Sequence, residues 1–495
     1  MFRIRLDQNL LVLYTFLKRW FAALESVPSA LEKRKWGEDV VDAKQMKEFR
    51  TKMYTDLYTG VVPERVPVQD GLAIEFLIQY AGKDLMTTQF SYTSDLLVEI
   101  FEKGREVCRG DMPVGSFARN PIAAMFQQSL TMEMSKTGFM QHPERSFMHE
   151  DEYDDFIKNP HEFIVEVCVP RMNKGYQKGE VFRALNFAKA LLASMDQNRH
   201  FAVAEATMAE RYGLFTRPAG SVGMQIVPFD FIADFYRGFS KIPIDMRRQP
   251  DKLIAAMEAL MPLAIAMAKT PVVSPLGCNM IMTHMAAFLN TKDFEKFYWP
   301  TFNQVCHIAA ERGQAMQIFL EGDWTRFLDY LVELPQGTRL YMEYGDPQQF
   351  KDKLGKKMVL GGFYPLTLLG SGTKEQCIDK AKELLDILAP GGNYYFCFDK
   401  SALNLTDINP ENYVAVMEYV LENGKYDNPG EIVTTAKKED SIQKYSHLYP
   451  EFKSKYIVSF DEFKQEYPPV DERIEPLMRA AYERYSAIVD MSMTM

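Results

Sequence analysis

Five segments in the C-terminal half repeat one pattern, and this repetition constrains the fold more than any other feature of the chain. Each is predicted to combine a short apolar strand, a polar or glycine-containing strand end and an amphipathic helix. In chain order they are DFEKFYWPTFNQV (293–305), IFLEGDW (318–324), MEYGDPQQFKDKLG (342–355), LGGFYPLTLLGSGTKEQ (360–376) and INPENYVAVMEYVLENGKY (408–426). This alternation is typical of an α/β fold built as a βα barrel, in which functional residues follow the strands.

Composition narrows the class of protein further. Of the 495 residues 47% are hydrophobic, so one enlarged barrel can account for most of the chain. The net charge of -10 argues against a nucleic-acid partner and against an anionic membrane surface. The most apolar stretch, 260–273, is too short to cross a bilayer. The 6 cysteines are scattered without a CxxC pair, which predicts reduced thiols in a cytoplasmic protein.

We expect three regions along the chain. Residues 1–45 form a helical extension that packs on the main domain or on a partner, which leaves a homodimer open. Residues 46–425 form the barrel, and 426–495 form a C-terminal extension packed on it. Within the barrel, strands are expected at 62–68, 221–230, 270–277, 315–320, 339–343, 357–362 and 393–398.

An ordered set of motifs points to a known family. The chain opens its barrel with YTGVVPERVPV, and later contains YGDPQQFKDKLG, LLGSGTKEQ and GGNYYFCFDKSALNLTDINPEN. Over roughly residues 50–425 this order resembles the uroporphyrinogen decarboxylase superfamily. The resemblance implies a (β/α)8 TIM barrel, uroporphyrinogen-decarboxylase-like, with its site at the C-terminal ends of the strands.

The superfamily carries out two kinds of chemistry. If the chain resembles the decarboxylases of this superfamily, it should bind a tetrapyrrole through an M-R-Q-A-G-R type segment and an F-S-D segment. This chain has VPERVPVQDGLAIEF in place of the first and no F-S-D. A porphyrinogen with many carboxylates needs arginine partners, and no compensating arginine cluster is evident. Decarboxylation of a porphyrinogen or another small acid is therefore the alternative reading.

The other branch of the superfamily transfers methyl groups with zinc. Its members place His-x-Cys after one strand and a further cysteine after a later strand. Here Phe319-Leu320-Glu321 occupies the first position, and no cysteine stands at 399–402. FLEGDW and DFEKFYWP resemble a branch from anaerobic bacteria. That resemblance implies demethylation: a methyl group moves from a small O-, N- or S-methyl compound to a corrinoid protein.

Three residues at predicted strand ends are candidates for a catalytic and metal site. Glu321 directly follows a strand and could act as a general acid or a metal ligand. Asp399 follows the last strand, on the same face as Cys397. With His284 they form an oxygen-rich set that zinc or another divalent ion accepts. For His284, the alternative is a hydrogen-bonded core residue.

Five further residues are candidates for substrate binding. We expect Trp324, Tyr364 and Met282 to line an apolar pocket that suits a neutral or cationic methylated substrate. Asp323 and Asp346 also follow strands, although both positions suit the N-terminus of a helix. A barrel that only binds a corrinoid or a small ligand, without catalysis, is a third class that these carboxylates argue against.

Overall fold

The structure is a computed structural model that describes residues 42–114, 118–433 and 438–494. Most of the expected N-terminal extension, 1–45, lies outside the described residues. Residues 43–495 form one compact unit. The expected division at 425 between barrel and C-terminal extension stays a prediction.

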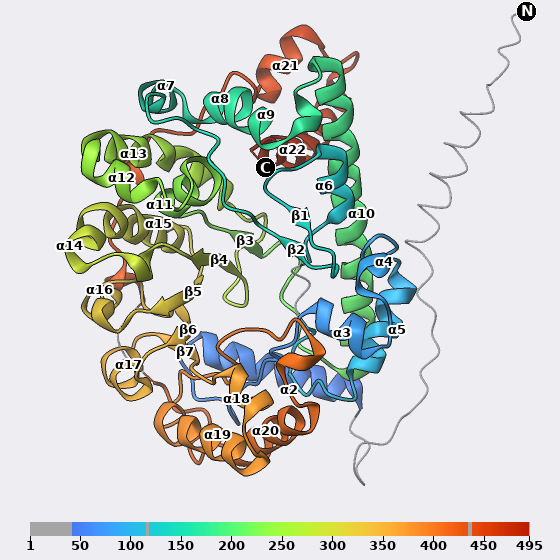
Figure 1. Ribbon diagram of the computed structural model, residues 1–495, viewed down its shortest axis with the longest axis vertical. Helices are drawn as coiled ribbons and strands as arrows, with labels where there is room; N and C mark the ends of the chain where they lie inside the picture. The colour runs from blue at the N-terminus through green and yellow to red at the C-terminus, as the bar shows by residue number, and fades with distance from the viewer. Residues whose placement is uncertain (1–41, 115–117, 434–437, 495) are drawn as a thin grey trace, which may run out of the picture. The chain divides into compact units, whose positions relative to one another are not determined.

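Five strands in the second half of the chain form a parallel sheet in sequence order. Helices alternate with them, because parallel neighbours need a crossover connection, and these helices lie on the outer side of the strands (Figure 1). The strands are β3 (Val222–Met224), β4 (Cys278–Thr283), β5 (Met316–Asp323), β6 (Arg339–Tyr344) and β7 (Val359–Gly362).

The helices fall into three groups along the chain. Before the sheet come α2 (Ala43–Tyr58), α3 (Ile74–Tyr80), α4 (Leu85–Gln89), α5 (Ser94–Gly104), α6 (Pro121–Gln127), α7 (Tyr153–Lys158), α8 (Pro160–Phe163), α9 (Val169–Met172) and α10 (Glu180–Tyr212). Between and after the strands come α11 (Pro228–Phe231), continued by the π-helix η3 (Ile232–Arg237), and α12 (Ile242–Arg248), α13 (Pro250–Met267), α14 (Thr291–Asp293), α15 (Trp299–Glu311), α16 (Leu328–Leu331), α17 (Pro347–Leu354), α18 (Leu366–Ser371), α19 (Lys374–Leu388) and α20 (Pro410–Asn423). The C-terminal region carries α21 (Phe460–Glu466) and α22 (Glu475–Ser492), and a short hairpin, β1 (Glu133–Met134) and β2 (Met140–Gln141), precedes α7.

Two further segments continue the parallel pairing beyond β7. Residues 394–398 pair with β7 and the residues after it, and residues 68–72 pair with 396–402. The strand predicted at 393–398 is present as isolated parallel pairings, whereas of the strand predicted at 62–68 only Val68 pairs in parallel, and the pairing continues to Leu72. The α/β fold with a parallel sheet is thus confirmed, while closure into eight strands stays a prediction.

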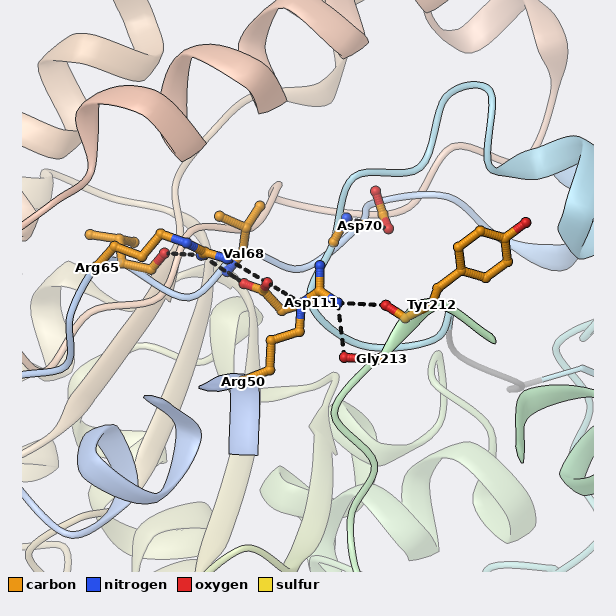
Figure 2. Close-up of polar contacts among 9 residues, drawn as sticks. Arg50, Arg65, Val68, Asp70, Asp111, Tyr212 and Gly213 are labelled. Atoms are coloured by element: carbon orange, nitrogen blue, oxygen red, sulfur yellow. Dashed lines mark hydrogen bonds and ion pairs between the residues drawn. The ribbon is translucent and has the colours of Figure 1, made fainter. Parts of the chain in front are cut away.

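A buried aspartate holds the part of the fold next to residues 66–68, where no regular ladder forms. The Asp111 backbone N–H donates to Val68 O at 2.9 Å, and its own carbonyl accepts from Phe215 N at 2.8 Å. Its carboxylate accepts two hydrogen bonds from Arg65, at 2.6 and 2.8 Å, and one from Arg50 at 3.0 Å (Figure 2). Arg50 also donates to two carbonyls at the end of α10. The carboxylate therefore connects α2 to the segment around Arg65 and, through Arg50, to the end of α10.

One predicted strand is wrong. Residues 270–277 were expected to form a strand, but the strand is β4, which begins at Cys278. Pro271 and Pro275 lack the backbone N–H that a ladder requires, so the chain turns there instead. β5 is longer than expected and runs to Asp323, which places Glu321 within the strand.

Helix α2 packs against β7 and the segments next to it. Tyr54 of α2 stacks on Phe215, with ring centroids 4.4 Å apart, inside a small apolar cluster that also contains Tyr395. Gly361 on β7 leaves room for the Tyr395 ring, since a Cβ there would lie 2.4 Å from it. The apolar packing fixes the strands on which the candidate site stands. No helix in the described ranges is long and apolar enough to cross a membrane.

Candidate active site

Glu321 lies on β5 at the C-terminal end of the parallel sheet. Phe319, two residues earlier on the same face, contacts Tyr341 of β6 inside the sheet, with ring centroids 4.8 Å apart. Glu321 Oε2 lies 3.5 Å from Nε2 of His284, and both side chains are 45% exposed. Partial burial raises the pKa of Glu321, and the neighbouring Glu343 adds to this, although His284 opposes it. Glu321 is thus a carboxyl group that keeps its proton to higher pH than an exposed glutamate.

His284 directly follows β4 and is held between two carboxylates. Its Nδ1 lies 2.5 Å from Oδ2 of Asp234, and its Nε2 faces Glu321. The hydrogen bond to Asp234, which is the largest cause, raises the pKa of His284 to about 9. His284 is therefore an imidazolium at neutral pH, with the Nε2 proton directed to the side of the site where Glu321 lies.

Asp234 and a second aspartate, one helical turn earlier, support His284 from the enclosed side of the site. Asp230 is buried and accepts hydrogen bonds from Tyr298 Oη at 2.6 Å and from Met285 N at 2.9 Å. Burial, and then the charge of Asp234, raise the pKa of Asp230 to about 7. Sequence reasoning missed both aspartates. Their four-residue spacing in FDFIAD, directly after β3, was the available signal, because it places both on one helical face.

A second polar group stands on the neighbouring strands. Glu343, at the end of β6, accepts from Lys400 Nζ at 2.9 Å and from Gly322 N at 2.9 Å. Lys400 also lies 3.8 Å from Oδ2 of Asp399. Burial alone would lower the pKa of Lys400, but Glu343 and Asp399 raise it to about 12. Asp234, His284, Glu321, Glu343, Asp399 and Lys400 are called the strand-end cluster below.

Asp399 belongs to the strand-end cluster but is closed to solvent. Its side chain is 2% exposed, and Oδ1 accepts from Leu366 N at 2.9 Å at the start of α18. Burial, the largest cause, raises its pKa. The structure therefore brings Glu321 and His284 together, while Asp399 is linked to them only through Lys400 and Glu343.

Two aromatic residues that were expected to line the substrate pocket lie elsewhere. Trp324 is fully buried, packs edge-on against Phe294, and donates from Nε1 to Glu321 O at 3.1 Å. Tyr364 is also fully buried and donates to Cys377 O at 2.9 Å. Both side chains face the helical layer outside the sheet, so neither can contact a substrate at the strand ends. Trp324 instead fixes the backbone of Glu321.

Of the remaining candidates, two aspartates lie at a turn and at the start of a helix, and Met282 is exposed beside the strand ends. Asp323 accepts from Thr325 N at 2.8 Å, and Asp346 caps α17 by accepting from Gln348 N at 2.9 Å. Both therefore have the capping role that was the alternative for them. Met282 is exposed on β4, and its place in a substrate pocket stays a prediction. Other exposed apolar side chains beside the strand ends are Met224, Phe288, Tyr344 and Leu403.

The donor set does not fit a resident zinc ion. A catalytic zinc uses three protein ligands. His284 Nε2 and Glu321 could supply two, but Asp399 is buried, bonded to a backbone N–H and next to the Lys400 ammonium. Within the described ranges, no group of three or more His, Cys, Asp or Glu is arranged to hold a metal ion. The expected zinc site of Glu321, His284 and Asp399 stays a prediction that this geometry does not support.

Comparison with known proteins supports the family resemblance over part of the chain. Residues 218–422 match the family model described as uroporphyrinogen decarboxylase (URO-D). They include the five strands of the sheet and the whole strand-end cluster. Among solved structures, a methyltransferase from Methanosarcina mazei matches with 14% sequence identity and a TM-score of 0.49, over 75% of this chain and 98% of that chain. No curated protein matches the chain.

Proposed function

We propose that this chain is a methyltransferase of the URO-D superfamily. It would move a methyl group from a small O-, N- or S-methylated compound to a corrinoid carried by a separate protein. One observation carries the proposal: His284 and Glu321 form a proton-donating pair, half-exposed, at the strand ends of the region that matches the family. We further propose that the five-stranded sheet and the parallel pairings that continue beyond β7 belong to a closed (β/α)8 barrel.

The pair suits the loss of a methyl group from a heteroatom. When the bond between the methyl carbon and the heteroatom of a neutral donor breaks, both electrons stay on the heteroatom, which then needs a proton. His284 donates that proton from Nε2, directly or through Glu321, and Asp234 stabilises the imidazolium beforehand. A reduced corrinoid, when bound, supplies the nucleophile that accepts the methyl group.

The surroundings of the pair favour a neutral or cationic substrate. The strand-end cluster combines the carboxylates of Asp234, Glu321, Glu343 and Asp399 with two cations, His284 and Lys400. Met282 and Phe288 expose apolar surface beside it, and Phe288 packs edge-on against the exposed Phe239, with centroids 5.0 Å apart. An apolar rim around polar groups is the usual lining of a small-molecule site. The rim also provides apolar surface for a corrinoid macrocycle.

Decarboxylation of a small acid is the second candidate. It is favoured by the imidazolium of His284, which could bind one carboxylate. Lys400 cannot add to this readily, because Glu343 and Asp399 already surround its ammonium group. A porphyrinogen with many carboxylates would leave most of its charges without a partner, at a high desolvation cost. The candidate is therefore limited to acids with a single carboxylate.

A direct assay tests the proposal. The purified protein would be incubated with a reduced corrinoid protein and, one at a time, methoxyaromatics, methylamines and methylthiols, while the corrinoid absorbance is followed. We expect methylation with at least one class of donor. Failure with every donor class, when the same corrinoid protein accepts a methyl group from a control methyltransferase, would contradict the proposal.

A further inference from the structure

Two arginines lie inside the sheet, below the strand-end cluster and near the N-terminal ends of the strands. Arg339 is the first residue of β6, and the register pairs it with Gln317 of β5. Tyr341 and Glu343 follow it on the same face, so Arg339 lies two levels below the candidate site. Arg217 reaches the same level, because its Nη2 donates to Gln317 Oε1 at 2.6 Å.

Arg339 is enclosed but only partly hydrogen-bonded. It is 1% exposed, and its guanidinium lies over the Tyr58 ring, 3.4 Å from the centroid. Nη2 donates to Pro275 O at 2.6 Å, whereas Nε and Nη1 are buried without an acceptor. A buried guanidinium normally uses its donors, since each unpaired N–H loses its hydration. Two donors of Arg339 thus point into protein with nothing to bind.

Arg217, at the same level of the sheet, also has a buried donor without an acceptor. Its Nη1 lies 3.2 Å from Cys278 Sγ, and its Nε is buried without an acceptor. The side chain as a whole is only half-buried, so solvent has a route to this level. The two guanidiniums are close enough that the charge of Arg217 lowers the pKa of Arg339, in addition to the larger effect of burial.

No carboxylate balances these charges within the described residues. Besides burial, the largest influences on the pKa values of both arginines come from tyrosines and Cys278, and for Arg339 also from Arg217. A third cation, Lys438, is close enough to Arg339 that burial and this neighbour both lower its pKa. The contrast with Asp111 is direct, because there two arginines share one buried carboxylate (Figure 2). Buried cations without a counter-charge are strongly unfavourable, so a negative partner is needed.

We propose that a small inorganic anion of the size of chloride binds between Arg217 and Arg339. It would accept from the free Nη1 of Arg339 and from Nε of Arg217. A small monovalent ion suits the site because Arg339 is enclosed, whereas Arg217 is only half-buried. The bound anion would link β6 to the residues just before β3, and so stabilise the sheet from below.

Thermal unfolding at constant ionic strength tests this site. The full chain would be unfolded in buffers in which chloride replaces gluconate, an anion too large to enter. A ligand that binds only the folded state raises the melting temperature in a saturating way. We expect a saturating rise of about 2 °C or more for the unaltered chain. Equal melting temperatures in the two salts would overturn the proposal.

Variants identify the groups that hold the ion. Arg339→Met removes the guanidinium but keeps the apolar stem, and should abolish the chloride dependence. Arg473→Met is the matched control, since Arg473 is exposed and pairs only with Asp471 nearby, and should keep the dependence. If Arg339→Met does not fold, Arg217→Gln takes its place. A chloride dependence that survives both substitutions would overturn the proposal.

Bromide gives a readout that needs no variant. Crystals of the unaltered chain grown with bromide should show an anomalous peak within hydrogen-bonding distance of both guanidiniums. The absence of a peak there, at bromide concentrations that saturate the thermal effect, would overturn the proposal.

Discussion

Nδ1 of His284 lies 2.5 Å from Oδ2 of Asp234, while Nε2 of the same ring lies 3.5 Å from Glu321. The ring thus connects an enclosed carboxylate to one at the edge of the site. Because the bond to Asp234 raises the pKa of His284 to about 9, the imidazole is charged before any substrate arrives. The predictions below begin from this pair.

Replacing Asp234 should make His284 mostly neutral at pH 7. In Asp234→Asn the largest cause of the raised pKa is lost, so the pKa of His284 should fall from about 9 toward about 6.5. NMR titration of the 7 histidine ring signals, with His284→Gln to assign one of them, measures this. A signal that still titrates near 9 in Asp234→Asn would show that Asp234 does not set the charge.

The same pair predicts a stability effect with a definite sign. A folded-state pKa raised above the unfolded value stabilises the fold fully below about 6.5, and this contribution is lost as the pH rises through about 9. Asp234→Asn should therefore be less stable than the unaltered chain at pH 6, and the difference should shrink by pH 10. Urea unfolding at both pH values measures it, and a difference of equal size at the two pH values would contradict the assignment.

Glu321 should matter for turnover and not for folding. Its side chain is half-exposed, so Glu321→Gln should unfold at nearly the same temperature as the unaltered chain. Loss of a group in proton transfer should lower kcat by about 100-fold or more in whichever reaction the protein catalyses. Glu295→Gln, at an exposed position on a helix outside the sheet, is the control and should be fully active. A fully active Glu321→Gln would remove this residue from the site.

Asp111 should be a determinant of acid stability. Burial alone would raise its pKa, but Arg65 and Arg50 outweigh burial and hold the pKa below the ordinary value. The carboxylate therefore stabilises the fold above the unfolded pKa of about 4, and this stabilisation is lost as the pH falls through the lower folded pKa.

Removing that carboxylate should be costly at neutral pH. Asp111→Ala leaves two largely enclosed arginines without a carboxylate partner, at a cost of about 3–5 kcal/mol. Asp379→Asn, an exposed position on α19, is the control. Chemical unfolding at pH 7 compares the two, and equal stability would contradict the central role given to Asp111.

Chelation should leave activity intact. Of the three predicted zinc ligands, His284 and Glu321 lie together and Asp399 does not join them, and the imidazolium must lose its proton before it can bind a metal. We expect zinc to be far below one equivalent by elemental analysis after dialysis against EDTA, with unchanged turnover. Tightly held stoichiometric zinc that is lost in Glu321→Ala would restore the metal site predicted from the sequence.

The arrangement of strands was predictable where hydrophobic pattern and helix alternation agree. β5, β6 and β7 contain the expected segments, because an apolar run between two amphipathic helices has few other structures available. The strand at 270–277 was misplaced because its apolar residues suggest a strand while its prolines prevent one. The segments at 68–72 and 394–398 pair at isolated residues, which periodicity cannot reveal.

The sequence allowed us to predict which residues of the candidate site follow strands. It did not allow us to predict the direction in which each side chain points. Glu321 and His284 were expected to meet because the ends of neighbouring parallel strands lie together, and their side chains do lie 3.5 Å apart. Trp324 could not be placed, since one change in backbone direction after Glu321 decides whether it faces the site or the core. Asp234 lies on a helix and not on a strand, so a search of strand ends could not find it.

The most direct measurement compares two products from the same protein. The unaltered chain and His284→Gln would each be given a reduced corrinoid protein with its best methyl donor, and separately a panel of small carboxylic acids and a porphyrinogen. The account predicts methyl transfer by the unaltered chain, a loss of about 100-fold or more in His284→Gln, and no release of carbon dioxide from any acid. Carbon dioxide release by the unaltered chain, with no methyl transfer to the corrinoid from any donor, would contradict it and establish the decarboxylase alternative.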